Sequence, residues 1–114
     1  MKILMICNNR DVAETIKEFF DVCGHKCEVA ADRKSAVLLL FLNKFDIVIA
    51  DLPLPDFDYS DLLISLKRNG TTNAKVFIVA ETDLSTSTTN ILREVGITGV
   101  LKKPLSVRLL ERML

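Results

Sequence analysis

The stretch Asp46-Ile-Val-Ile-Ala-Asp51-Leu-Pro-Leu-Pro-Asp-Phe-Asp58 governs the interpretation of the rest of this chain. Its first part, Ile47–Ala50, is apolar throughout, which is typical of a strand buried on both faces of a parallel sheet. Asp51 follows this run immediately. In open parallel sheets, ligand chemistry takes place at the carboxyl ends of the strands. The stretch therefore predicts a buried strand that carries a carboxylate to a candidate site.

Similar apolar runs occur on both sides of this stretch and predict four more strands: Ile3–Cys7, Cys27–Ala30, Val76–Ala80 and Gly99–Leu101. Helical patterns alternate with them: residues 12–23, 32–44, 58–68, 84–95 and a short segment after Pro104. Asp58 and Asp61 have the spacing of a capping box at the start of the third helix. Five βα units with right-handed crossovers predict an α/β fold, a doubly wound domain over residues 1–114 with helices on both faces of a parallel sheet.

Composition limits the kind of protein that this chain can be. Its 114 residues suffice for one domain, and 49% hydrophobic with 26% charged residues is typical of a globular protein. Fifteen basic and fifteen acidic residues balance, so we expect no nucleic-acid surface. The longest apolar run, Ala36–Leu42, is too short to span a membrane, and we find no signal peptide. Three cysteines, an odd number, are most simply reduced thiols, which predicts a cytoplasmic protein.

Polar or small residues stand at the predicted strand ends, where the site is expected. They are Cys7 and Asn8 after the first strand, Asp51 after the third, Ala80 at the end of the fourth, and Lys103 after the fifth. The carboxyl ends of parallel strands meet at one edge of the sheet, so Asp51 and Lys103 should face each other there. This pattern therefore predicts a site in which an acidic and a basic side chain face each other.

These residues resemble the receiver domain of two-component response regulators, the CheY-like family, over essentially the whole chain. The most specific pieces are the stretch 46–58 and Leu101-Lys-Lys-Pro104. The resemblance implies a flavodoxin-like sheet of order 2-1-3-4-5. It implies that a histidine kinase's phosphoryl group would pass to Asp51 and that Lys103 would contact it. In the family, two acids after the first strand help to hold Mg²⁺, a Thr or Ser after the fourth binds a phosphoryl oxygen, and an aromatic residue in the fifth reports the change.

This sequence departs from the family at those supporting positions. The acid pair falls on Cys7 and Asn8, the hydroxyl residue on Ala80, and the aromatic residue on Val100. Mg²⁺ prefers oxygen ligands, whereas a thiol suits softer metals and an amide is neutral. We therefore expect no metal or cofactor, or only weak Mg²⁺ binding through Asp51, Asn8 and the carbonyl of Pro53.

Asp51 has two interpretations: a working phosphoacceptor in a poor site, or a remnant paired with Lys103. Because charge neutralisation by the metal dominates phosphoryl transfer, we favour the second. It predicts a pseudo-receiver that acts by protein–protein interaction and is not an enzyme, and the alternative is a genuine phosphorelay receiver. A nucleotide- or flavin-binding enzyme is a third reading, but no glycine loop follows the first strand.

The second predicted helix is apolar on all sides from Ala36 to Leu42. Leu38, Phe41 and Leu42 share one face of it, at positions that are usually polar in the receivers this chain resembles. An exposed apolar stripe marks an interaction surface, so we expect these three side chains to contact a signalling partner, a histidine kinase or output protein, or a second copy. The alternative is that neighbouring segments of the same domain cover them.

Three smaller expectations concern the cysteines and the fourth helix. Cys23 continues the helix face formed by Val12, Ile16 and Phe19, so both Cys23 and Cys27 should be buried thiols. Cys7 should be a small apolar filler, with a redox role as the alternative if Lys103 lowered its pKa. Residues 85–90, which are all Ser, Thr or Asn, should fray the fourth helix because these residues are poor helix formers. The alternative is a solvated polar face of a helix that Ile91, Leu92 and Val95 hold in place.

Overall fold

The computed structural model describes residues 1–51, 54–58, 61–62, 64–65, 74–80, 85–94, 96–103 and 105–113. Its strands are β1 (Lys2–Ile6), β2 (Lys26–Ala30), β3 (Ile47–Asp51), β4 (Lys75–Ala80) and β5 (Gly99–Lys102). Its helices are α1 (Arg10–Val22), α2 (Arg33–Leu42), α4 (Thr86–Glu94) and α5 (Val107–Met113). All strand pairs are parallel, in the order β2-β1-β3-β4-β5. This confirms the predicted doubly wound fold and its strand order.

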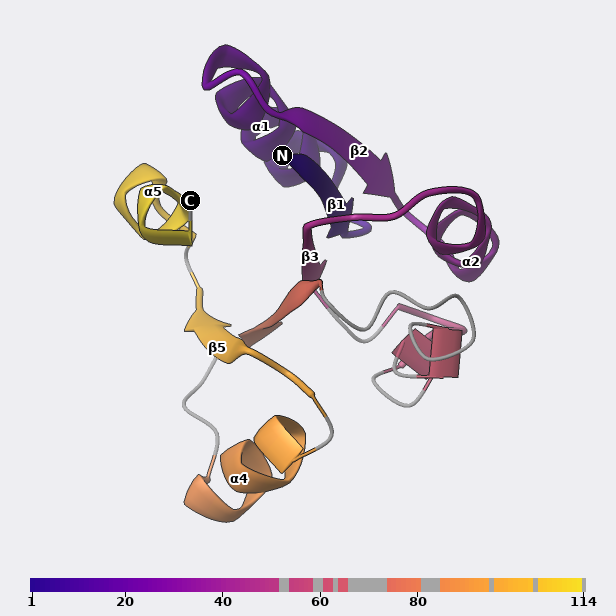
Figure 1. The fold of residues 1–114 in the computed structure, drawn as a ribbon, viewed down its shortest axis with the longest axis vertical. Coiled ribbons are helices and arrows are strands. Elements are labelled where there is room, and N and C mark those ends of the chain that lie inside the picture. The colour runs from indigo at the N-terminus through magenta and orange to yellow at the C-terminus, as the bar shows by residue number, and fades with distance from the viewer. Residues whose placement is uncertain are drawn as a thin grey trace.

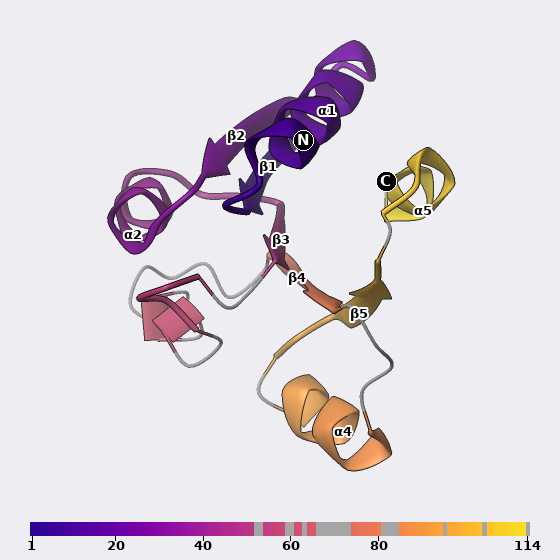
Figure 2. The ribbon, with the colours of Figure 1, turned by 180° about the vertical axis from the view of Figure 1, so that it is seen from behind.

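Helices cover both faces of the sheet. Figures 1 and 2 show α1 and α5 on one face, and α2 and α4 on the other. Along β1 the side chains alternate, so that Ile3 and Met5 join the cluster under α1, while Leu4 and Ile6 join the cluster under α2. Burial of both faces explains why the central strands are continuous apolar runs. None of the helices in the part of the chain that the structure describes is long and apolar enough to cross a membrane.

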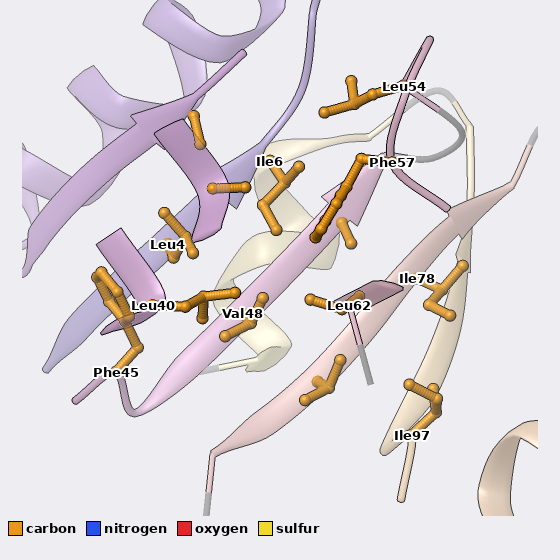
Figure 3. Close-up of a cluster of buried hydrophobic side chains, with 14 of the residues drawn as sticks. Leu4, Ile6, Leu40, Phe45, Val48, Leu54, Phe57, Leu62, Ile78 and Ile97 are labelled. Carbon is orange, nitrogen blue, oxygen red and sulfur yellow. The ribbon is translucent and has the colours of Figure 1, made fainter. Parts of the chain in front are cut away.

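The loop after β3 contributes to the core. Leu54 and Phe57 are buried and pack with Val48 and Leu62 in the cluster under α2, as Figure 3 shows. Each donates its backbone N–H to the other's carbonyl oxygen, at 2.9 and 3.3 Å. The sequence analysis treated this stretch as a motif and did not predict its part in the core. The two side chains therefore anchor residues 54–58 to the core.

The buried face of α1 differs from the predicted one. Ala13, Ile16 and Phe20 are buried, whereas Val12 and Cys23 are exposed. The prediction that Cys23 is a buried thiol is therefore wrong, while Cys27 is buried as expected. Both faces satisfy helical spacing, and burying Phe20 removes much more apolar surface from water than burying Cys23 would. The helix is rotated accordingly.

The predicted capping box is present in the segment after β3. The backbone N–H of Asp58 donates to the Asp61 carboxylate at 3.0 Å, and the N–H of Asp61 donates to Asp58 Oδ1 at 3.1 Å. Residues 61–62 and 64–65 are helical. The remainder of the helix expected over 58–68 lies outside the described residues.

Helix α4 begins two residues later than predicted, after Ser85. The Oγ of Ser85 accepts the backbone N–H of Thr88 at 3.2 Å, which caps the first turn. After its last turn the chain turns at Gly96, whose φ of +105° favours glycine. Residues 86–90 are helical here. Fraying stays a prediction that amide exchange over these residues tests.

Candidate functional site

Asp51 lies at the end of β3 and faces Lys103, which follows β5. The Nζ of Lys103 lies 3.1 Å from Oδ1 of Asp51, and the exposed fractions of the two side chains are 37% and 17%. The backbone N–H of Lys103 donates to the carbonyl oxygen of Ala80 at 2.9 Å, so the sheet itself positions the lysine. The predicted meeting of acid and base at this edge is present. Its geometry is that of a half-buried ion pair.

Cys7 approaches the other oxygen of the same carboxylate. Its Sγ lies 3.7 Å from Oδ2 of Asp51 and 3.6 Å from the carbonyl oxygen of Asn9. A thiol carries one proton, so it donates to one of these oxygens at a time. The backbone N–H of Asn9 donates to the sulfur at 3.4 Å. Both carboxylate oxygens of Asp51 therefore have a donor beside them within the domain.

The environment of Cys7 keeps its thiol protonated. Burial raises the pKa of Cys7, and the hydrogen bond from Asn9 lowers it in part. The negative charge of Asp51 raises the pKa of Cys7 further. The positive charge of Lys103 lowers the pKa of Cys7, and this effect is the smallest of them. The redox alternative required a lowered pKa, so these directions disfavour it. Cys7 is a buried side chain, as its interpretation as an apolar filler predicted.

A hollow opens beside the ion pair, between α1 and the segment after β5. Its lining includes Asn8, Asp11, Thr15, Asp51 and Lys103. Asn8 is exposed and offers a neutral amide oxygen. The described residues contain no group of three or more His, Cys, Asp or Glu side chains placed to hold a metal ion. Pro53, the third ligand considered in the sequence analysis, lies outside the described residues.

The two predicted switch positions lie on neighbouring strands. Ala80 pairs with Lys102 across the β4–β5 ladder, and Val100 pairs with Ile78. Val100 is partly buried and packs against the cluster under α2 and α4. Ala80 is close to Lys103 through the backbone but carries only a methyl group. Neither residue brings a hydroxyl group or an aromatic ring to this edge.

Asn9 has a role at the site that the sequence analysis missed. Its side chain accepts the backbone N–H of Val12 at 3.2 Å and caps α1, while its main chain holds the sulfur of Cys7. An Asn immediately before a helical pattern is a usual N-cap, and this signal could have found it. Asn9 thus couples the start of α1 to the side chain beside Asp51.

Leu38, Phe41 and Leu42 are exposed on α2, as the sequence predicted. Ile64 is exposed as well and lines the same hollow as Leu38 and Phe41, between α2 and residues 61–65. The sequence analysis did not single it out. The alternative, in which the domain covers these three α2 side chains, is wrong for the described residues.

Comparison with known proteins identifies the family of this chain. The sequence model of the response regulator receiver domain matches residues 3–114. The chain belongs to the response regulator receiver domain family. This membership disfavours the nucleotide- or flavin-binding enzyme.

Curated relatives of this receiver domain are longer proteins. It is 27% identical over 106 residues to a response regulator receiver protein of Anaeromyxobacter sp. (strain Fw109-5), covering 93% of this chain and 44% of the relative. It is 25% identical over 106 residues to the response regulator SaeR of Staphylococcus aureus, covering 93% of this chain and 45% of the relative. The chain therefore spans less than half of the length of these relatives.

Solved receiver structures superpose closely on this one. The receiver domain of the Francisella response regulator 1452 is 28% identical, with a TM-score of 0.83 over 98% of this chain and 91% of that one. A two-component response regulator from Clostridium difficile is 25% identical, with a TM-score of 0.85 over 99% and 91%. The chemotaxis protein CheY4 of Vibrio cholerae, 19% identical with a TM-score of 0.86 over 98% and 93%, shares the fold.

Proposed function

We propose that this receiver domain is a pseudo-receiver: it serves two-component phosphorelay signalling through protein–protein contact, and Mg²⁺-dependent phosphorylation of Asp51 is impaired. One observation carries the proposal. The Asp51 carboxylate is held between Lys103 Nζ at 3.1 Å and the protonated thiol of Cys7 at 3.7 Å. The carboxylate therefore has its charge and hydrogen-bonding partners within the domain.

The donor set argues against a magnesium site. Mg²⁺ is a hard cation that is held by carboxylates, phosphates and water. The two positions after β1 supply a thiol, Cys7, and a neutral amide, Asn8. A buried thiol kept protonated by its surroundings does not act as a metal ligand, because the thiolate is the ligand form. These residues do not fit the ion.

Loss of the metal matters because of the chemistry of phosphoryl transfer. The transition state spreads charge over the transferred oxygens, and catalysis consists mainly of positioning and charge neutralisation. Lys103 is one cation, and it is already engaged with the nucleophile. Attack by Asp51 would require its carboxylate to leave this ion pair while the developing charge lacks a divalent ion.

The expected readout of phosphorylation is weakened too. A hydroxyl group that could follow a phosphoryl oxygen is replaced by the methyl of Ala80, and the ring that could change its rotamer is replaced by Val100. Val100 is partly buried and packs against the cluster under α2 and α4. These replacements support a domain that presents one surface irrespective of phosphorylation.

The partner that we infer is a signalling protein, a histidine kinase or an output protein. Receiver domains act in such pairs, and the balanced charge of the chain offers no footprint for nucleic acid. Leu38, Phe41 and Leu42 form an exposed apolar surface on α2, and exposed apolar surface usually marks a protein contact.

The alternative is a genuine phosphorelay receiver. The observation that favours it is the Asp51–Lys103 pair, because both residues stand at the positions that the family uses for the acceptor and its lysine. In that case the site would accept a phosphoryl group slowly.

Intact mass after incubation with a small-molecule acyl phosphate and Mg²⁺ separates the two functions. We expect no phosphoryl adduct on the native chain. A matched positive control restores the family residues with Cys7→Asp, Asn8→Asp and Ala80→Thr, and this variant should gain an adduct that further substitution by Asp51→Asn removes. An adduct on the native chain that Asp51→Asn abolishes would establish the phosphorelay receiver instead.

A further inference from the structure

The exposed apolar side chains of α2 and of residues 61–65 gather in one place. Leu38, Phe41 and Leu42 on α2 are 51%, 70% and 63% exposed, and Ile64 is 51% exposed. Leu38, Phe41 and Ile64 line a common hollow between the two segments, which lie on the same face of the sheet in Figures 1 and 2. We call these four residues the α2 patch. Contiguous exposed apolar surface of this kind usually marks a contact.

The two walls of the α2 patch are fixed to each other and to the core. Ala36 and Leu40, on the opposite side of α2, are fully buried. One guanidinium nitrogen of Arg33 lies 3.0 Å from the carboxylate of Asp61 and donates to the carbonyl oxygen of Asp56 at 3.2 Å. A surface that is already ordered loses little conformational entropy when it binds. The α2 patch is therefore prepared for a partner of matching shape.

We propose that the occupant of the α2 patch is a second copy of this chain, bound through the same patch with the two α2 helices antiparallel. Among the described residues that line the same hollow, the charged side chains are Arg33, Lys34, Asp56 and Asp61, two of each sign. A rim that carries charges of both signs can face its own copy without the repulsion that a single-sign surface would cause. Such an isologous contact closes on itself as a two-fold dimer.

The ends of α2 favour the antiparallel arrangement. Its first turn carries the bases Arg33 and Lys34 and no acid, and its last turn carries no base. The N-cap Asp32, which accepts the N–H of Ser35, offsets these two bases at the N-terminal end, whereas the carbonyl end lacks the cation that a helix dipole favours in its last turn. A two-fold axis near Leu38 brings the bases of each α2 to the carbonyl end of the other. Lys44 and Asp46, which follow that end, are opposite in sign and offset each other.

The area available suits a weak but specific dimer. An aromatic side chain buries on the order of 150–250 Å², and leucine and isoleucine are somewhat smaller, so the α2 patch offers roughly 400 Å² per copy at its observed exposure. Two copies with their charged rims thus reach about 1,000 Å² in total, the lower limit for a specific interface. We expect a dissociation constant in the micromolar range. The inference goes beyond the proposed function, because either a pseudo-receiver or a phosphorelay receiver could form this dimer.

Sedimentation equilibrium of the 114-residue chain, from low to high micromolar concentration, tests the proposal without a phosphodonor. We expect a monomer–dimer equilibrium that Phe41→Asp weakens by roughly tenfold or more, as does Leu38→Asp. Ile91→Asp on α4 is the matched control, since Ile91 is 60% exposed and lies on another element. It should leave the equilibrium unchanged. Circular dichroism of each variant checks that it is folded.

Two results would overturn the proposal. One is a monomer throughout the concentration range, which would mean that this surface does not bind its own copy. The other is a dimer that Ile91→Asp disrupts while Phe41→Asp does not.

A second measurement keeps the test decisive if an aspartate variant fails to fold. In a Cys23→Ser chain, Leu38→Cys places two thiols across the proposed axis, and a short bis-maleimide should join them. Val22→Cys, which replaces a side chain 82% exposed on α1, is the matched control and should yield no covalent dimer. Equal crosslinking of both variants would also count against the proposed axis.

Discussion

Cys7 changes the electrostatics of the site as well as its ligands. Its Sγ lies 3.7 Å from Oδ2 of Asp51, where a carboxylate would repel the nucleophile unless a divalent cation stood between them. A neutral thiol removes that repulsion and donates a proton instead. Lys103 then suffices to neutralise Asp51. A thiol at Cys7, where the family has an acid, therefore explains why the site should bind Mg²⁺ poorly. It also explains why the Asp51 carboxylate has suitable partners without the ion.

Restoring the acids should restore dependence on the metal. In the absence of Mg²⁺, the Cys7→Asp, Asn8→Asp variant should have a lower Tm than the native chain, because close carboxylates repel. Millimolar Mg²⁺ should raise the Tm of the variant by several degrees and that of the native chain by less than about one degree. Differential scanning calorimetry measures both. Cys7→Ser with Asn8→Ser, which adds no charge, is the control, and an equal response of native chain and variant would contradict the argument.

The three thiols should react at very different rates. Cys23 is exposed, whereas Cys7 and Cys27 are buried and burial raises the pKa of both. With an aromatic disulfide reagent near pH 8, we expect one fast thiol and two that react only as the chain unfolds, since the thiolate is the nucleophile. A Cys23→Ser chain should lose the fast phase. A second fast thiol in the native chain would instead reveal a reactive Cys7.

The residues that form the site could be predicted from the sequence, whereas most of the hydrogen bonds between them could not. Cys7, Asp51 and Lys103 could be brought together from strand ends alone, because parallel strands end at one edge of the sheet. The direction of the Cys7 thiol and its contact with Asn9 could not be predicted, because both depend on the backbone path between β1 and α1. The predicted burial of Cys23 was wrong. Helical spacing alone did not distinguish the face that includes Cys23 from the adjacent face of α1, which is the buried one.

Among the elements, α1 depends on Asn9, the N-cap residue that precedes it. The side chain of Asn9 accepts the N–H of Val12, one of the four at this end without a partner inside the helix. We expect Asn9→Ala to lower the free energy of unfolding by about 1 kcal/mol, and Asn9→Ser, which keeps a capping oxygen, to lower it much less. Urea denaturation measures both. Equal losses would mean that accepting the N–H of Val12 is not how the Asn9 side chain stabilises the domain.

For the entire domain, the alternation of apolar runs and helical patterns was sufficient to predict topology. A run such as Ile47–Ala50 must be buried on both faces, and that leaves a parallel sheet covered by helices on each side. The burial of Leu54 and Phe57 could not be predicted in this way, because two apolar residues in a proline-containing loop have no periodicity. Their burial becomes visible only when the loop is folded back against Val48 and Leu62.

The stability of the domain should fall at high pH because of Cys27. This side chain lies on β2 among the residues under α1, and burial raises the pKa of its thiol from 9.0 to about 11. The folded chain therefore keeps the proton more tightly than the unfolded chain. The resulting stabilisation is complete below pH 9.0 and is lost as pH rises to about 11, because the unfolded thiol ionises first. Urea denaturation at pH 8, 9, 10 and 11 measures the slope.

A Cys27→Val chain isolates this effect, since valine keeps an apolar side chain of similar size at the position and cannot ionise. All other ionisable groups are common to the two chains, so their contribution cancels in the difference between the two slopes. We expect the native chain to lose more stability than Cys27→Val between pH 9 and pH 11, and the two to run parallel between pH 7 and pH 8. Parallel curves across the alkaline range would mean that β2 opens enough for Cys27 to ionise in the folded domain.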